Sequence, residues 1–168
     1  MWYRHGALID DHQKNFIQSL DTTHKKVIVL THHNGTNIEG TAPLSLWHEV
    51  TSAFGKAPDF WYWGHIHNAI VYSAHSFPAQ QGVQARCVGH GAIPFGVAYG
   101  LQNPDGSNKP SIAYFAHELL SSVFPHTDVQ QANRVLNGFM LLTLKADAIT
   151  EELIDQMGVV RWSQTMAI

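Results

Sequence analysis

The sequence predicts a single domain, residues 1–168, with an α/β fold of the α+β kind, in which a mixed sheet is followed by C-terminal antiparallel strands. The length suits one domain with a sizeable core. A run of apolar, mostly β-branched residues at 26–31 predicts a strand covered on both faces. A helical pattern and a second apolar strand follow it, which is the order of a parallel strand–helix–strand unit.

Periodicity and breaker residues place the elements of the N-terminal half. Helices are expected from Asp10 or Asp11 to about Leu20, and from Pro43, near the first turn, to Gly55. Strands are expected at 26–31, Phe60–Trp63, Ala69–Tyr72 and Gly82–Val88. Large aromatic side chains fit a pleated, half-covered surface, so the four rings of Phe60–Trp63 favour a short buried strand.

The C-terminal half is less regular. The segment 111–126 is ambiguous, although its apolar residues at helical spacing suggest a helix, and Gly138–Leu144 predicts a buried strand. Residues 151–155 favour a helix by propensity, but Met157-Gly158 and the apolar residues after it favour a hairpin. We therefore expect two antiparallel strands at the end, with Glu151 and Glu152 on a solvated face.

Composition excludes several classes of function. Charged residues make up 14% of the chain, below the typical quarter, which indicates that a partner covers part of the surface. The net charge of −3 and the pI near 6.4 give no nucleic-acid footprint and no basic membrane face. The sequence has no signal peptide, and no apolar run reaches about 18 residues. Since the single Cys87 also fits a reducing compartment, we expect a cytoplasmic location.

Histidines follow the ends of the two expected parallel strands. His32 comes directly after residues 26–31, and His65 and His67 come after the aromatic strand and Gly64. A spacing of two in an extended segment places both imidazoles on one face, and parallel neighbours bring His32 to the same sheet edge. Imidazole nitrogens are ligands for divalent transition metals. The His-x-His motif alone leaves open the alternative of two ordinary surface histidines.

This constellation resembles the calcineurin-like metallophosphoesterase family. The run Val27-Ile28-Val29-Leu30-Thr31-His32-His33 looks like that family's strand ending in a metal-binding histidine, and Gly64-His65-Ile66-His67 looks like its Gly-His-x-His signature. The resemblance covers about Asp10 to Tyr72, and only loosely the rest. The family's three earlier signatures, an Asp-x-His, a Gly-Asp and a Gly-Asn-His followed by an acid, have no counterpart. The chain thus resembles the C-terminal half of the family's domain, as a fragment, a truncated product or a chain without the front half.

The resemblance implies a four-layer α/β/β/α sandwich that hydrolyses phosphomonoesters or phosphodiesters with metal-activated water. It assigns His32 and His65 to one ion of a two-metal centre and His67 to the other, with Mn, Fe, Zn or Ni as the divalent metal. Three neutral imidazoles cannot balance the charge of two divalent ions, so one ion instead of two is the alternative. We expect an incomplete metallophosphoesterase-like hydrolase with a phosphoester small-molecule substrate. The rival is a non-catalytic, oligomerising remnant or interaction module of the same fold.

Three further polar residues could contribute to the expected metal site. Candidates for catalytic contacts with phosphate or water are His90, which follows a strand and is flanked by glycines, and Asn34. His33 is expected behind the ligands or in the core. The alternative for His90 is a tight structural turn. A half-domain exposes the edges of its first two strands, and we therefore expect a homo-oligomer.

Overall fold

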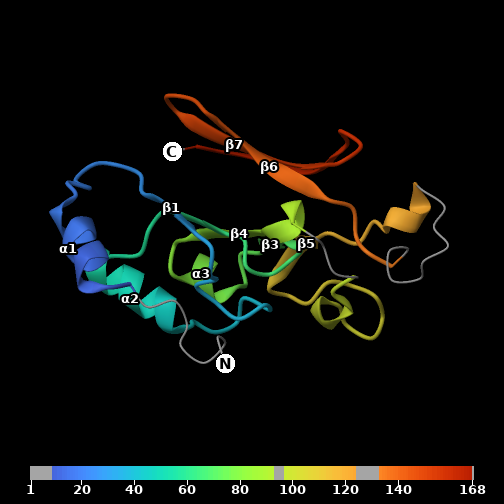
Figure 1. Ribbon diagram of the computed structural model, residues 1–168, viewed down its shortest axis with the longest axis horizontal. Helices are drawn as coiled ribbons and strands as arrows, with labels where there is room; N and C mark the ends of the chain where they lie inside the picture. Colours follow the sequence, from blue (N-terminus) through green and yellow to red (C-terminus); the bar gives the residue numbers. More distant parts are fainter. Residues whose placement is uncertain (1–8, 93–96, 124–132, 168) are drawn as a thin grey trace.

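The computed structural model describes residues 9–92, 97–123 and 133–167, which form two sheets with helices beside the larger one (Figure 1). The larger sheet has the order β1-β2-β4-β3-β5; its strands are β1 (Ile28–Thr31), β2 (Phe60–Trp63), β3 (Ala69–Tyr72), β4 (Gln84–Val88) and β5 (Ile112–Phe115). β1, β2 and β4 are parallel, and β3 is antiparallel to both of its neighbours. The second sheet is an antiparallel meander of β6 (Gly138–Leu144), β7 (Ala148–Asp155) and β8 (Val160–Ala167). The α+β class, with a mixed sheet and C-terminal antiparallel strands, is confirmed.

The helices begin and end where local chemistry favours it. In α1 (Asp11–Ser19), Asp10 and Gln13 form a reciprocal capping box, in which each side chain accepts a hydrogen bond from the other residue's backbone N–H. α2 (Ser45–Phe54) ends at Gly55, whose φ of 70° suits glycine. α3 (Phe77–Gln80) is a single turn, and the 3₁₀ helices are η1 (Gly89–Gly91), η2 (Tyr99–Leu101) and η3 (Leu120–Ser122). No helix in the described ranges is both long and apolar enough to cross a membrane.

β2 lies at the centre of the layers because its side chains alternate between two cores. Trp61 and Trp63 belong to a core that includes α2, whereas Phe60 and Tyr62 pack with Ile149 of the meander. α2, the larger sheet and the meander therefore form three layers, and Figure 1 shows β6 and β7 above the larger sheet. On the outer face of β6, Phe139 and Leu141 are exposed, so no described segment covers them as a fourth layer.

Some expectations about single segments are wrong. Residues 112–115 form a strand rather than a helix, and the part of 111–126 after Val123 lies outside the described residues. β1 is not covered on both faces, since it is an edge strand and Leu30 is 71% exposed. β6 is covered on one face only and alternates between partly buried and exposed side chains.

Glu151 is not on a solvated face but completely buried between the sheets. Arg86 of β4 donates from Nε to its carboxylate over 3.0 Å, and Nη2 lies 2.8 Å from the same oxygen. The hydroxyl of Tyr62 donates to the other carboxylate oxygen. Burial raises the pKa of Tyr62 well above its usual value and Glu151 raises it further, so the phenol keeps its proton. The two sheets are therefore joined by a buried, hydrogen-bonded ion pair.

Candidate metal centre

The ends of β1 and β2 bring two histidine segments together. Parallel pairing sets Thr31 opposite Trp63, so the chain leaves both strands at the same edge. The carbonyl oxygen of His32 then accepts hydrogen bonds from the backbone N–H of Gly64 at 3.2 Å and of His65 at 2.7 Å. The backbone thus places His32 beside His65, as the sequence predicted.

Three imidazoles converge at this edge. One ring nitrogen from each of His32, His33 and His65 lies within 4.8 Å of the other two. His65 Nδ1 and His32 Nε2 are 3.3 Å apart, and the His33 ring centroid is 4.7 Å from that of His65. Zinc–nitrogen bonds of about 2.0–2.1 Å place two ligands of a tetrahedral ion about 3.3 Å apart. The distance between His32 and His65 matches this value, and the three nitrogens are a candidate ligand set for one transition-metal ion.

The local electrostatics favour the form of imidazole that binds metal. Burial lowers the pKa of His65, and the neighbouring His33, His32 and His67 lower it further. A neutral ring offers a lone pair for ligation. His32 is exposed, whereas His33 and His65 are half-buried, so the cluster is open to solvent on one side. Among the described residues, no carboxylate or thiolate joins this group.

The cluster differs from the set expected from the sequence in one member. His32 and His65 are together as predicted, and the third ring is His33, which had been expected behind the ligands. His67 is half-buried and close enough to lower the pKa of His65, but it is not one of the three converging rings. Adjacent side chains point apart in a strand, but the chain bends directly after β1, at residues 32 and 33. The bend lets the rings of the consecutive residues His32 and His33 approach the same point. In the sequence, the only sign of this arrangement is that the two histidines are adjacent.

The segment that carries His65 is hydrogen-bonded to, and closely packed against, the end of β4. Cys87 is fully buried, and its thiol donates to the carbonyls of Ile66 and Asn68, at 3.3 Å each. A Cβ on Gly89 would lie 1.9 Å from the carbonyl oxygens of Gly64 and Ile66. Only glycine at position 89 therefore allows this close approach, and the loop that carries His65 packs directly against the chain at the end of β4.

Asn34 is engaged in shaping the loop after the cluster. Its side-chain amide donates to the backbone carbonyl of Thr36, which is itself fully buried. The carbonyl of Gly35 accepts from the backbone N–H of Leu44 at 2.8 Å, just before α2. Asn34 therefore has a conformational role in the loop, and its catalytic role stays a prediction.

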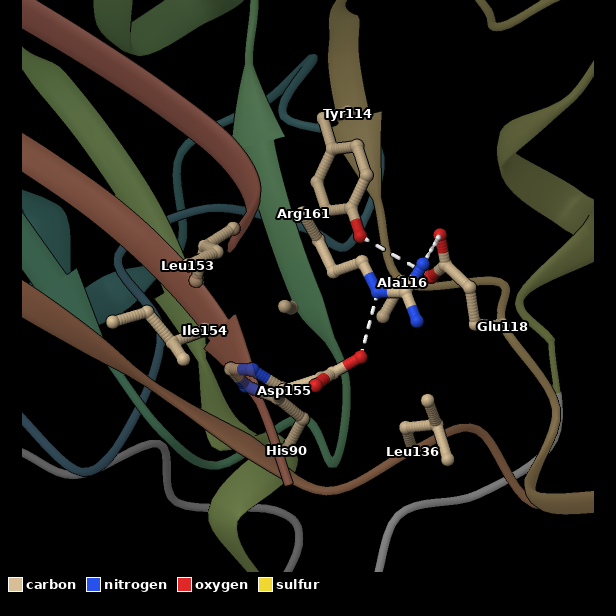
Figure 2. A pocket seen from close by; sticks show the side chains of 10 residues that line it. His90, Tyr114, Ala116, Glu118, Leu136, Leu153, Ile154, Asp155 and Arg161 are labelled. Carbon is tan, nitrogen blue, oxygen red and sulfur yellow. Dashed lines mark hydrogen bonds and ion pairs between the residues drawn. The ribbon is translucent and has the colours of Figure 1, made fainter. Parts of the chain in front are cut away.

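His90, the other predicted catalytic residue, is buried between the larger sheet and the meander. It is 4% exposed and lines a cavity of about 10 Å³, together with residues that include Tyr114, Asp155 and Arg161 (Figure 2). A Cβ on Gly138 of β6 would lie 2.6 Å from His90 Nε2, so the ring fills space that this glycine leaves. Burial lowers the pKa of His90 to about 4. Among the described residues, no hydrogen bond or ion pair joins His90 to the three histidines, and its catalytic role stays a prediction.

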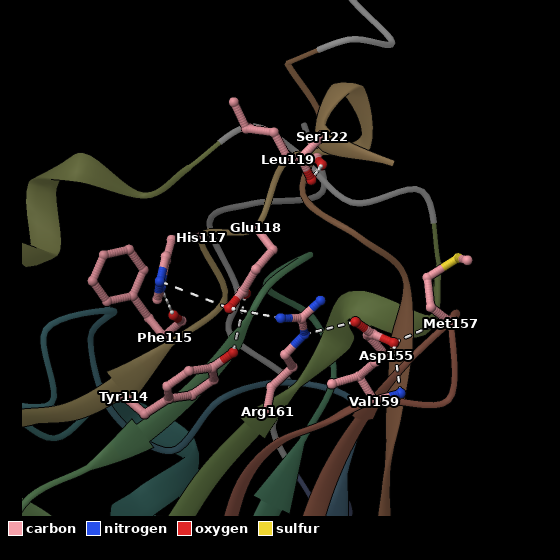
Figure 3. A network of polar contacts seen from close by, with 10 residues as sticks. All are labelled: Tyr114, Phe115, His117, Glu118, Leu119, Ser122, Asp155, Met157, Val159 and Arg161. Atoms are coloured by element: carbon pink, nitrogen blue, oxygen red, sulfur yellow. Dashed lines mark hydrogen bonds and ion pairs between the residues drawn. The ribbon is translucent and has the colours of Figure 1, made fainter. Parts of the chain in front are cut away.

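A polar network next to this cavity ties β5 to the β7–β8 hairpin (Figure 3). Arg161 donates from Nε to Asp155 at 2.6 Å, and its Nη1 lies 3.6 Å from Glu118. Burial raises the pKa of Asp155, but hydrogen bonds from the Val159 backbone, Arg161 and the Met157 backbone lower it overall. These residues are paired with one another, so the network joins the segment after β5 to the β7–β8 hairpin.

Two comparisons with known proteins add nothing to this geometry. No protein-family model matches the chain, and no curated protein matches it either. The arrangement of the three histidines is therefore the feature of this chain that points to a function.

Proposed function

We propose that this chain carries a metal-dependent phosphoester hydrolase site in which one divalent transition-metal ion is held by His32, His33 and His65. The observation that supports it most is the approach of three ring nitrogens to within 4.8 Å at the carboxyl edge of a mixed sheet, where α/β proteins bind ligands. Phosphoester hydrolysis is favoured over other hydrolyses by the motif resemblance of His32 and Gly64-His65-Ile66-His67.

The ligand chemistry narrows the metal within this proposal. An all-imidazole set suits Zn, Ni or Fe better than ions that prefer oxygen, such as Mg or Ca. The ion would supply Lewis acidity and activate water for attack on phosphorus. The residues contribute geometry, because the backbone hydrogen bonds of the His32 carbonyl hold His32 beside His65, and burial lowers the pKa of His65, which favours the neutral ring. The proposed setting is the cytoplasm, where the thiol of Cys87 stays reduced.

Titration with Zn²⁺ followed by calorimetry tests the ligand set. We expect one ion per chain, and loss of affinity by more than about 100-fold in His65→Ala and in His33→Ala, beyond the 10–100-fold typical of groups that only support a ligand. The matched control is His75→Ala, which removes an exposed histidine elsewhere and should bind like the parent. Hydrolysis of bis(p-nitrophenyl) phosphate that needs the ion and is lost with it would support the enzyme. Absence of stoichiometric metal contradicts the proposal.

A second candidate is a non-catalytic metal-binding module of the same fold. It is favoured by the lack of any carboxylate in the histidine group of the described residues, because a bridging carboxylate would be needed for two ions. The same titration separates the two functions. Stoichiometric Zn²⁺ with no hydrolysis of mono- or diesters, with Zn²⁺, Mn²⁺ or Ni²⁺ added, supports the module.

A further inference from the structure

The hydroxyl of Thr31 lies between the core and the histidine cluster. The buried indole of Trp61 donates from Nε1 to Thr31 Oγ1 at 2.9 Å. The same hydroxyl donates to the backbone carbonyl of His33 at 2.7 Å. Its acceptor and donor roles are both used, and this fixes the direction of its one proton.

The indole at the start of this chain of hydrogen bonds has little freedom. Trp61 is fully buried and stacks on Trp47, with ring centroids 5.2 Å apart and planes inclined by 19°. A Cβ on Gly35 would lie 3.2 Å from its ring, so the indole also packs against the loop that follows His33. The indole N–H of Trp61 therefore has a fixed position and direction in the core.

We propose that Thr31 is a positioning residue for metal binding, because it transmits the fixed position of Trp61 to the backbone of His33. The bend after β1 turns the His33 ring toward His32 and His65, and the hydroxyl bond to the His33 carbonyl holds that bend. Without the hydroxyl, the carbonyl and the indole N–H both lose a partner, and the third ring loses its defined direction. This inference rests on the proposed metal site and names what organises it.

Zn²⁺ affinity of matched threonine variants tests the proposal. Thr31→Val keeps the branched shape and removes the hydroxyl, and we expect affinity to fall about 10-fold. Thr31→Ser keeps the hydroxyl and should stay within about threefold of the parent. The control is Thr150→Val, which removes a strand hydroxyl paired with Thr165 on the meander, and should bind like the parent. A Thr31→Val protein that binds with parental affinity overturns the inference.

A double-mutant comparison shows whether Thr31 acts through His33. In a His33→Ala background, Thr31→Val should weaken Zn²⁺ binding by less than about twofold. A second full 10-fold loss would mean that Thr31 acts on the site by another route, which contradicts the inference.

A measurement without metal separates this inference from the proposed function. In the metal-free protein, the ring resonances of His33 in long-range ¹H–¹⁵N spectra should shift in Thr31→Val and stay unchanged in Thr31→Ser and Thr150→Val. If the parent binds no Zn²⁺, the proposed function fails, while these spectra still decide whether Thr31 positions His33. If Zn²⁺ binds and the His33 resonances do not respond to Thr31→Val, only the present inference fails.

Discussion

His90 is a titratable side chain held in a setting that opposes its charge. Its ring is buried between η1 and β6, and its Nδ1 has no hydrogen-bond partner among the described residues. The adjoining cavity, of about 10 Å³, is close to the smallest space that holds one water molecule. Burial lowers the pKa of this imidazole to about 4, far below the value near 6.5 of an unfolded chain.

This difference predicts a loss of stability in mild acid. Between pH 6.5 and 4 the unfolded chain takes up a proton on His90 that the folded chain refuses, so the free energy of unfolding falls as the pH falls. We expect His90 to account for about 1.5 kcal/mol of loss between pH 6.5 and 5, because the slope rises toward its limit of about 1.4 kcal/mol per pH unit over this range. Urea denaturation of the parent and of His90→Gln measures it. The variant should lack this part of the slope, and equal slopes would show that His90 is protonated in the fold.

Among the elements, the loop between β2 and β3 decides the geometry of the site. Its backbone bonds to the His32 carbonyl on one side and receives the Cys87 thiol on the other. Gly89 at the end of β4 touches the loop so closely that no side chain fits. Strand pairing and one glycine contact thus fix the position of His65.

Gly89→Ala should therefore damage both the fold and the site. The added methyl meets two backbone oxygens, which cannot rotate away as a side chain would, and we expect a loss of about 3 kcal/mol in unfolding free energy. Zn²⁺ affinity should fall about 10-fold in the protein that remains folded. Gly100→Ala is the matched control in another 3₁₀ helix, because a Cβ there meets nothing within 4 Å. Equal stability of the two variants would contradict this account.

The same elements show what the sequence could predict. α2, with its apolar spacing and Gly55, and β2, with four aromatic rings, are found where local patterns placed them. Parallel pairing of β1 and β2 was enough to bring His32 to His65. The 112–116 segment was ambiguous because Ile112, Phe115 and Ala116 satisfy helical spacing, while its pairing with β3 depends on residues about 40 positions away.

What the sequence could not predict depends on contacts distant in the chain or on local bends. Glu151 looked like part of an exposed acidic pair, because its partner Arg86 is 65 residues away. The sequence placed His33 behind the ligands or in the core, because the direction of its ring depends on the bend after β1, which we propose is held by Thr31 and Trp61. A strand pattern specifies faces, but it does not specify how the chain turns when the strand ends.

At the scale of the molecule, Arg86 and Glu151 couple the two sheets. The guanidinium also donates to the Ala85 carbonyl and lies 5.2 Å from the centroid of the Trp162 ring. Its charge is therefore compensated on several sides, as a buried ion requires.

Removing the Glu151 charge should cost much of the stability. Glu151→Gln leaves Arg86 buried without an anionic partner, and the expected loss is about 3–5 kcal/mol in unfolding free energy. Glu152→Gln, at the neighbouring and partly exposed position, should stay within about 0.5 kcal/mol of the parent. Chemical denaturation of both variants gives the comparison. A small and equal effect in the two would mean that the ion pair is unimportant for joining the sheets.

The outer edge of β1 predicts self-association. Among the described residues no strand pairs with that edge, Leu30 is 71% exposed, and α1 has no buried residue. We expect light scattering at high micromolar concentration to report about twice the 18.7 kDa chain mass, and Leu30→Lys to restore the monomer. Leu144→Lys changes another exposed leucine, on β6, and should leave the dimer intact. A monomeric parent, or dissociation by Leu144→Lys alone, contradicts an interface at β1.

The alternation of side chains in β2 has a consequence for how this strand finds its alignment during folding. Since all four residues are aromatic, sliding the strand by one position would still present large rings to both cores, and hydrophobicity alone would tolerate the shift. The polar groups of these rings would not tolerate the shift. The indole N–H of Trp61 donates to Thr31 on one face of the sheet, and the phenol of Tyr62 donates to Glu151 on the opposite face, and both hydrogen bonds would be lost. Two hydrogen bonds, one on each face, thus select a single alignment and place the glycine and histidines that follow.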